Sequence, residues 1–532
     1  MDRFVAGAHF YNYDMFGSLR AGRDAHLLTR AHAGLAAAAF ASAFVYVGLR
    51  SGLLFMVGAE LAFSAHELQA VDRLAELPAA FAFVVGVVMD AAPLAGFHRK
   101  SYMIVGLVLV LASLSLLSAA FCFGTAIQNA LGGGYIYVVT LLIGTTSVGS
   151  MINFVAAHTR VVELSQRESL GDRGILQAHY LVARVSGQAT ARISVFAISQ
   201  VDASLHVPLV MLAVSTVSIA SLATVILYLD EGEDRRRRSI RTECAVYWTL
   251  TQQKALWRIL GFVSTFAFAL GFKFKQAQRA VQAWSRVESM QQDTLLSSIA
   301  ADGVMLGAVL LWRWCFMNSL WRRVFSLGPI VAIVSQLLLL TLTTSGVFRH
   351  PAFFVFATSL TGVPTALLAL STLVPVTEIA QESSEGGVAG LALSFYTISK
   401  VFASTFLSAL QHAAVFEIGE PVVEDSQRVR SLVAAAQVAT IAVHALALGG
   451  IALLPLQKLD AQQLRMFGGF TRRAAPVAVV AGAGLLLYCV VFNVLLLIPS
   501  TATLFVTGDS GDDSERGHGA AGSNDTTRIG SR

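Results

Sequence analysis

The sequence has few charged residues. Asp, Glu, Lys and Arg make up 13% of its 532 residues, about half of the share of about 25% that is usual in soluble domains. Hydrophobic residues make up 55%, and the mean hydropathy is +0.65. These values exclude a soluble globular protein and predict a polytopic membrane protein.

The motifs of several enzyme classes are also missing. The four cysteines, Cys122, Cys244, Cys315 and Cys489, are scattered, so we expect neither a disulfide framework nor a metal site. There is no Walker-type glycine-rich loop, no nucleophile elbow and no HExxH pair, so neither a built-in ATPase nor a cofactor is expected. A polytopic protein without an energy-coupling domain is most simply a secondary transporter, not an enzyme, with two helix bundles around a midplane site.

The excess of basic residues predicts topology rather than a nucleic-acid partner. The formal net charge is +5, but the cations lie in short loops between apolar stretches. Their distribution favours a cytoplasmic N-terminus and a cytoplasmic central loop, because Lys and Arg concentrate in cytoplasmic loops. We expect a multi-pass protein, most simply of the plasma membrane, in contact with lipid.

Apolar stretches of about 20 residues predict the spans. We expect an N-terminal bundle over 31–229, with spans near 31–58, 75–94, 101–123, 133–157, 174–199 and 206–229. A second bundle is expected over 257–455, with spans near 257–275, 295–317, 325–347, 352–377, 386–412 and 432–455, and an extra span over 476–499. The rest is expected to be a cytoplasmic segment (1–30), a cytoplasmic linker loop (230–256), a basic loop (456–475) and a disordered tail (508–532).

Polar residues follow one face of the predicted fifth span. Gln177, Arg184, Gln188 and Arg192 are spaced by seven, four and four residues, which places them on one narrow helix face. A charged residue in hydrocarbon costs about 2.5–3.5 kcal/mol, so this face should meet a wet cavity. Its two guanidinium groups suit an anionic or carboxylate-bearing substrate. Alternatively, they tether the bundles by pairing with acids such as Glu163, or snorkel at the membrane edge.

Other ionisable residues in spans are further candidates. Arg50 and Lys400 are predicted to contribute to substrate binding, although Arg50 lies where it could also reach the membrane interface. Asp302 is either a proton-coupling carboxylate or a residue that pins a helix end. Lys273 and Lys275 lie near the end of a span, where we expect snorkelling.

A charged hairpin joins the second and third spans. Asp90 ends one apolar stretch, Pro93 and Gly96 break it, and Arg99 and Lys100 precede the next. A carboxylate that faces cations in a short loop is costly in lipid but useful at a protein-buried gate. We therefore predict that Asp90, Arg99 and Lys100 form a cytoplasmic gate, which makes and loses contacts with the other bundle.

Four segments carry a resemblance to a known family. They are GVVMDAAPLAGFHRKSYMIVG at the hairpin, VVELSQRE with GDRGILQAHYLVAR before and in the fifth span, TEIAQESSEGGVAGLALS, and LLPLQKLDAQQLRMFGG. In this order they resemble the protist branch of the folate-biopterin transporter family, within the major facilitator superfamily. The matching positions are Asp90, Pro93, Gly96, Arg99, Lys100, Tyr102, Arg173, Gly174, Gln177, Tyr180, Arg184, Glu378, Glu385, Gly386 and Gly390.

The resemblance implies a major facilitator-type fold and movement of folate, biopterin or a related small organic anion by alternating access, with protons as a coupling ion. The chain departs from the family at Phe154 and His158, where the family pattern has two acids. His158 could titrate in their place, or could be a polar residue that is hydrogen-bonded between helices. This departure leaves open a receptor-like paralogue that does not transport; a membrane enzyme acting on lipid is a further alternative.

Overall fold

The computed structural model describes residues 17–61, 65–123, 134–233, 237–285, 290–411 and 425–497. Within these ranges the chain folds into helices and has no β-strand, so the predicted all-α fold class is confirmed. The expected tail over 508–532 and residues 1–16 of the expected N-terminal segment lie outside the described ranges.

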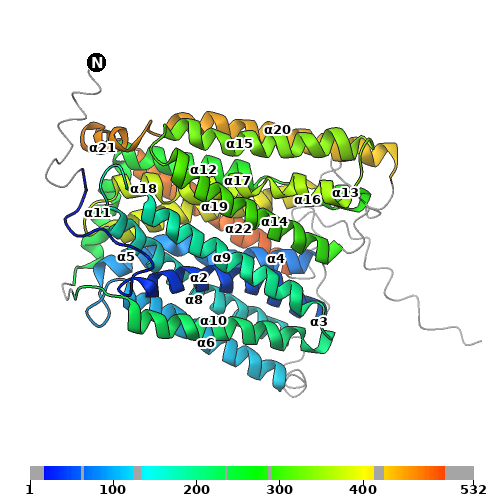
Figure 1. Cartoon of the computed structure of the whole chain (residues 1–532), viewed down its shortest axis with the longest axis horizontal. Coiled ribbons are helices and arrows are strands. Elements are labelled where there is room, and N and C mark those ends of the chain that lie inside the picture. Colours follow the sequence, from blue (N-terminus) through cyan, green and yellow to red (C-terminus); the bar gives the residue numbers. More distant parts are fainter. Residues whose placement is uncertain are drawn as a thin grey trace, which may run out of the picture.

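Long helices run side by side along the long axis of the molecule (Figure 1). The N-terminal half contains α2 (Ala33–Val47), a π-helical turn (Gly48–Leu53), α3 (Leu54–Glu60), α4 (Ala65–Glu76), α5 (Ala82–Ala91), α6 (Lys100–Cys122), α8 (Gly134–Ser165), α9 (Ile175–Ile198) and α10 (His206–Tyr228). The C-terminal half contains α12 (Lys254–Gly271), α14 (Met290–Leu311), α15 (Trp321–Leu338), α16 (Pro351–Ser359), α17 (Gly362–Ser371), α18 (Val374–Ile379), α19 (Glu385–Gln411) and α20 (Gln427–Gly450). The helix α22 (Ala474–Leu497) follows them.

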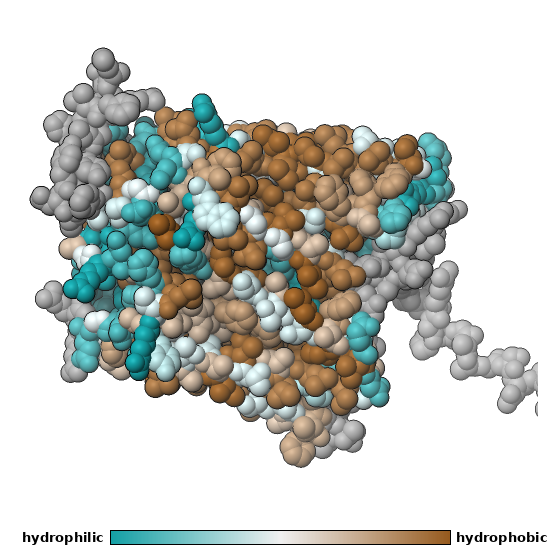
Figure 2. All heavy atoms as spheres, viewed as in Figure 1, coloured by the Kyte–Doolittle hydropathy of each residue, from teal (hydrophilic) through white to brown (hydrophobic). Residues whose placement is uncertain are grey.

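Twelve helical segments of the described chain are long and apolar enough to cross a membrane, and α22 is one of them. The 24-residue helix α9 is not among the twelve, because its glutamines, arginines and histidine lower its mean hydropathy. It is nevertheless packed between α2 and α14. Figure 2 shows the matching surface, a hydrophobic band between two hydrophilic ends.

Three further helices lie outside the candidate spans. The predicted linker loop over 230–256 contains α11 (Ile240–Gln252), and the predicted basic loop over 456–475 contains α21 (Lys458–Phe467). The third, α13 (Lys275–Trp284), follows α12 after a short break. Sequence analysis missed all three, because their amphipathic stretches are too short and too polar for a span.

The two ends of the molecule are named here by their loops. The end that carries the α5–α6 loop, with α11 and α21, is the hairpin end, and the opposite end, with α3 and α13, is the far end (left and right in Figure 1). The two halves meet where α5 packs on α19 and where α9 packs on α14. These two seams position the site.

The α5–α19 seam depends on glycine. A Cβ atom added to Gly86 would lie 2.1 Å from the carbonyl oxygen of Gly386, and one added to Gly390 would lie 2.5 Å from the carbonyl oxygen of Ala82. Real Cβ atoms do not approach backbone this closely. The absence of side chains therefore lets the two backbones touch.

We expect Gly86→Ala to destabilise the protein by about 1–3 kcal/mol, because it overpacks this seam. Gly303→Ala is the matched control, since a Cβ atom at Gly303 in α14 would meet nothing within 4 Å and alanine favours a helix by up to about 1 kcal/mol. Thermal unfolding of the purified proteins measures both. Equal unfolding temperatures for the two variants would contradict the close-approach argument.

Candidate substrate cavity

A cavity of about 310 Å³ lies between the two halves, at the lower end of the range of roughly 300–1,000 Å³ for ligand pockets. The N-terminal half lines it from α2, α8 and α9, and the C-terminal half lines it from α14, α17 and α19. Its aromatic side chains are Tyr46, Phe154 and Tyr396. The cavity therefore has walls from both halves, with flat rings and charged groups among them.

Three of the four predicted polar residues of α9 line this cavity, namely Arg184, Gln188 and Arg192. Gln177 does not line it. Its side-chain amide donates to Thr377 Oγ1 on α18 at 2.8 Å, so the residue joins the two halves near the hairpin end. Three residues of this polar helix face thus line the cavity, and the fourth joins the two halves.

Asp302 on α14 accepts bonds from two of these residues. Arg192 forms an ion pair with it, and Gln188 Nε2 donates to its Oδ1 at 2.6 Å. The carboxylate is 3% exposed and connects α14 to α9 across the seam. Both expected roles of Asp302, proton coupling and pinning of a helix end, stay predictions.

A second charged cluster lies on the far-end side of the cavity. Arg50, in the π-helical turn, holds Asp72 through two bonds of 2.6 and 2.7 Å and Glu76 at 2.9 Å. Lys400 on α19 reaches Glu76 from the opposite half at 2.5 Å. Two cations therefore meet two carboxylates, and the charges of Arg50 and Lys400 are balanced within the protein.

The positive charge of Arg184 is not balanced by a carboxylate in the part of the chain that the structure describes. Among the residues that the structure describes, it has no ion pair and no hydrogen bond, and its guanidinium carbon lies 3.8 Å from the centroid of the Phe154 ring. The Tyr180 ring is 5.9 Å away. Cation–π contact of this kind stabilises a guanidinium group but leaves its five N–H donors available.

His158 lies beside this group. Its Nε2 is 3.2 Å from the carbonyl oxygen of Thr372 in the C-terminal half, and its ring contacts those of Phe154 and Tyr180 edge-on. It is 2% exposed, and its Nδ1 has no partner in the described part of the chain. The family resemblance implies an acid at positions 154 and 158. This chain instead has Phe154, whose ring packs against Arg184, and His158, whose ring contacts that of Phe154.

The hairpin end is closed by contacts around Asp90. This carboxylate accepts from the backbone N–H groups of Gly386 at 3.2 Å and Gly387 at 2.8 Å, at the first turn of α19. Arg99 donates to it at 2.6 Å, and the hydroxyl group of Tyr247 on α11 donates as well. An acid is stabilised at a helix N-terminus by the N–H groups and the helix dipole. Asp90 thus ties α5 to α19.

Charge around Arg99 strengthens this arrangement. Its Nε donates to Glu163 at 2.8 Å, while an Nη donates to Asp90. Burial alone would lower the pKa of Arg99, but the Glu163 and Asp90 carboxylates outweigh it and hold that pKa well above its usual value. Burial and the Asp90 carboxylate raise the pKa of Tyr247.

Lys100 takes a different place from the one predicted. Its Nζ donates to the carbonyl oxygens of Leu229 at 2.8 Å and Ile226 at 3.0 Å, at the end of α10 in its own half. A cation is favourable there because it meets free helix carbonyls. Of the three predicted gate residues, only Asp90 reaches the opposite half directly.

Further contacts between the halves at this end were not predicted. Arg173 forms a buried ion pair with Glu378 at 2.8 Å, and Gln462 on α21 donates to the same carboxylate at 2.7 Å. Gln166 donates to the carbonyl oxygens of Thr377 and Ala380. Arg173 and Glu378 both lie in the segments that carry the family resemblance, so the sequence did contain a signal for these two residues. Tyr247 gave no signal, because it lies in a stretch expected to be a loop.

The loop before α9 fixes the start of that helix. Glu168 accepts from the N–H groups of Gly174 at 2.9 Å and Leu176 at 2.8 Å. Burial raises the pKa of Glu168 to about 7 although these bonds and Arg173 oppose the change. Gly174 has a φ of +128°, a conformation that glycine adopts without strain. This turn fixes where α9 begins and therefore the direction in which its polar face points.

The described residues contain no group of three or more His, Cys, Asp or Glu side chains that could hold a metal ion. The polar groups of the cavity are instead arginines, amides, hydroxyl groups and single carboxylates. Such a lining suits an organic molecule with charged and hydrogen-bonding groups.

Comparison with known proteins gives the fold. No family model matches the sequence, and no curated protein matches it either. Among solved structures, a bacterial homologue of the iron transporter ferroportin is 12% identical, covering 78% of this chain and 98% of its own, with a TM-score of 0.51. A proton-dependent oligopeptide transporter is 13% identical, covering 80% and 98%, with a TM-score of 0.53. A bacterial homologue of human drug peptide transporters is 14% identical, with the same coverage and TM-score.

The chain has the major facilitator fold. With its twelve apolar helical segments it is a multi-pass integral membrane protein. These likenesses concern the fold alone, so the resemblance to the folate-biopterin transporter family stays a prediction.

Proposed function

We propose that this protein is a secondary transporter that moves a small organic anion by alternating access. The observation that carries the proposal is Arg184, which faces the cavity between the halves without a carboxylate partner in the described structure. The other cations of the cavity, Arg50, Arg192 and Lys400, are all paired with acids. An unpaired guanidinium group in a cavity inside the protein is best stabilised by an anion that binds there.

The rings of the cavity narrow the class of substrate. Phe154 already stacks on Arg184, and Tyr46 and Tyr396 are further flat surfaces in the lining. A conjugated ring with a carboxylate would use both features, since rings pack on rings and a guanidinium group holds a carboxylate through two bonds. Folate has both features, whereas biopterin has the ring but no carboxylate. We therefore take folate as the first candidate, ahead of biopterin.

Alternating access would use the two seams. Under this proposal the bundles over 31–229 and 257–455 rock against each other, and the Asp90 contacts break when the hairpin end opens. We propose that this end faces the cytoplasm and that the membrane is the plasma membrane. Asp302 and His158 are the candidate residues for coupling to protons. If protons are coupled, a collapsed pH gradient will abolish concentrative uptake.

Counterflow in proteoliposomes tests the proposal. Vesicles with the purified protein are loaded with unlabelled folate, biopterin, pteroate or a dicarboxylate and then given a trace of labelled folate. We expect the label to accumulate transiently when the internal anion is a substrate and not in protein-free vesicles. Saturable folate binding without any counterflow would overturn transport and favour the receptor-like paralogue.

A further inference from the structure

A second compartment lies between the cavity and the far end. It has a volume of about 360 Å³ and shares Arg50, Glu76, Thr365, Tyr396 and Lys400 with the lining of the cavity. We call it the vestibule. Because the two spaces share these five residues, the vestibule adjoins the cavity.

The vestibule has an excess of positive charge. Its lining contains five cations, Arg50, Arg73, Lys273, Lys275 and Lys400, but two carboxylates, Asp72 and Glu76. Those two acids already hold Arg50 and Lys400. Three cations of the lining are thus without a carboxylate partner in the ranges that the structure describes.

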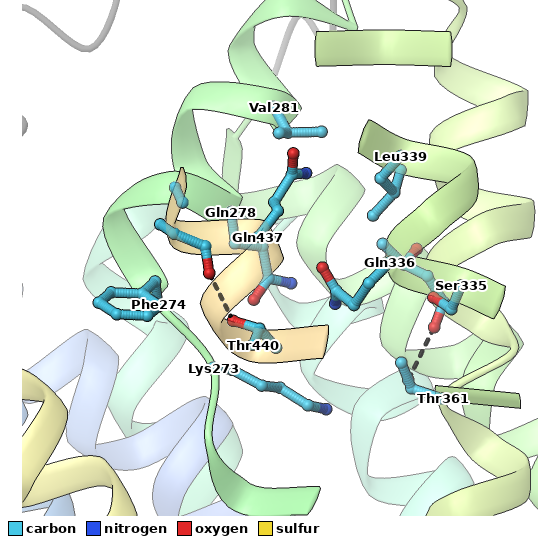
Figure 3. A pocket seen from close by; sticks show the side chains of 13 residues that line it. Lys273, Phe274, Gln278, Val281, Ser335, Gln336, Leu339, Thr361, Gln437 and Thr440 are labelled. Carbon is cyan, nitrogen blue, oxygen red and sulfur yellow. Dashed lines mark hydrogen bonds between the residues drawn. The ribbon is translucent and has the colours of Figure 1, made fainter. Parts of the chain in front are cut away.

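Lys273 is the cation whose placement is most informative. It lies in the break between α12 and α13, where Phe272 and Phe274 are extended. Figure 3 shows its side chain pointing into the space below Gln336 and Thr440 rather than along a helix surface. It has no hydrogen bond or ion pair to a described residue. Burial and the nearby Lys400 lower the pKa of Lys273. Lys273 thus lines two pockets between helices, while the snorkelling that the sequence predicted stays a prediction.

Two buried side chains with unused polar atoms face the same compartment. His444 on α20 is 1% exposed, and neither of its ring nitrogens has a partner in the described structure. Arg73 on α4 is 3% exposed; among the described residues it binds only the neutral oxygens of Asn493 and Gln69, both at 3.3 Å, and its Nε has no partner. The unused donors and acceptors of these two buried side chains are open to a ligand or a water molecule.

We propose that the vestibule is a second anion-binding subsite, in which Lys273, Arg73 and His444 hold a carboxylate or phosphate group of the transported molecule. The subsite draws Arg73 from the N-terminal half and the other two residues from the C-terminal half, so a bound anion joins the halves at the far end. The inference rests on the proposed transport of anions. It adds that the preferred cargo has two separated anionic groups, one for Arg184 and one for the vestibule.

Sulfate tests the subsite without any assumption about the cargo. Thermal unfolding is measured in sulfate and in chloride at equal ionic strength, because a ligand that binds only the folded state raises its stability with concentration. We expect sulfate to stabilise the wild type and to bind Lys273→Gln at least tenfold more weakly, as expected when a charged hydrogen bond is lost. Lys273→Arg, which keeps the charge, should retain most of the effect.

Lys254→Gln is the matched control, since Lys254 is an exposed lysine at the other end of α12. It should respond to sulfate as the wild type does. An equal sulfate response in Lys273→Gln and the wild type, or no response in the wild type, overturns the subsite.

A second arm compares folate with pteroate, which lacks the glutamate part with its two carboxylates and keeps a single carboxylate on its benzoate ring. We expect Lys273→Gln to weaken folate binding at least tenfold and to leave pteroate binding within twofold. An equal loss for both overturns the assignment to a second anionic group. Counterflow without a sulfate response overturns only the subsite. A sulfate response that is lost in Lys273→Gln, without counterflow of any anion in the wild type, overturns only the proposed transport.

Discussion

Arg184→Ala is expected to lower the affinity for a carboxylate-bearing substrate by roughly 10- to 100-fold, because hydrogen bonds to charged groups contribute about 1.5–3 kcal/mol. Uptake at low substrate concentration should fall by a similar factor. Arg184→Lys should be intermediate, since lysine keeps the charge but loses the planar fork that stacks on Phe154. Initial uptake rates and binding isotherms, normalised to the amount of folded protein, measure these effects.

The control for this experiment is Arg323→Ala. Arg323 is an exposed arginine on α15, and its loss changes the net charge equally without touching the cavity. Uptake in this variant should match the wild type. Unchanged affinity in Arg184→Ala would remove Arg184 from the site and with it the main support for an anionic substrate.

Asp90→Ala is expected to have the largest effect on conformation. It removes the acceptor of the Gly386 and Gly387 N–H groups, of Arg99 and of Tyr247. The bonds from Gly386 and Gly387 cross between the halves and exist only while the hairpin end is closed, and hydrogen bonds to a charged group contribute about 1.5–3 kcal/mol. The population should therefore shift toward a state that is open at this end.

Cysteine labelling measures the shift. In a variant without its four native cysteines, Thr397 in the cavity lining is replaced by cysteine and treated with an impermeant thiol reagent from each side. Asp90→Ala should raise labelling from the hairpin side and lower it from the far side. Asp172→Ala is the control, since it removes an exposed carboxylate from a loop at the same end. The same labelling pattern with and without Asp90 would exclude it from the gate.

Sequence periodicity predicted the features that are determined within a single helix, such as which residues share a face. The spacing along α9 placed Arg184, Gln188 and Arg192 on one face, and the structure puts all three in the cavity lining. The length of apolar stretches likewise predicted the twelve apolar helical segments, since a membrane sets that length directly. Such features need no knowledge of neighbouring segments.

Pairing between distant segments could not be predicted in the same way. Arg192 meets Asp302 across 110 residues of sequence, and Lys400 meets Glu76 across 324. Both pairs depend on how two halves pack. For the same reason the sequence did not distinguish Arg184, which is unpaired, from Arg50, which is held by two acids. The contact of Lys100 with α10 and the role of α11 also depend on tertiary packing.

The composition of α9 has a consequence for how the protein is made. This helix lacks the apolar character of the twelve candidate spans, and Arg192 receives its carboxylate partner from a helix that is synthesised later. A nascent chain that ends after α10 therefore lacks the acid that pairs with Arg192, and an unpaired arginine within a membrane costs about 2.5–3.5 kcal/mol. We therefore expect stable integration of α9 to depend on the arrival of α14, so that the C-terminal half completes the N-terminal half during biosynthesis.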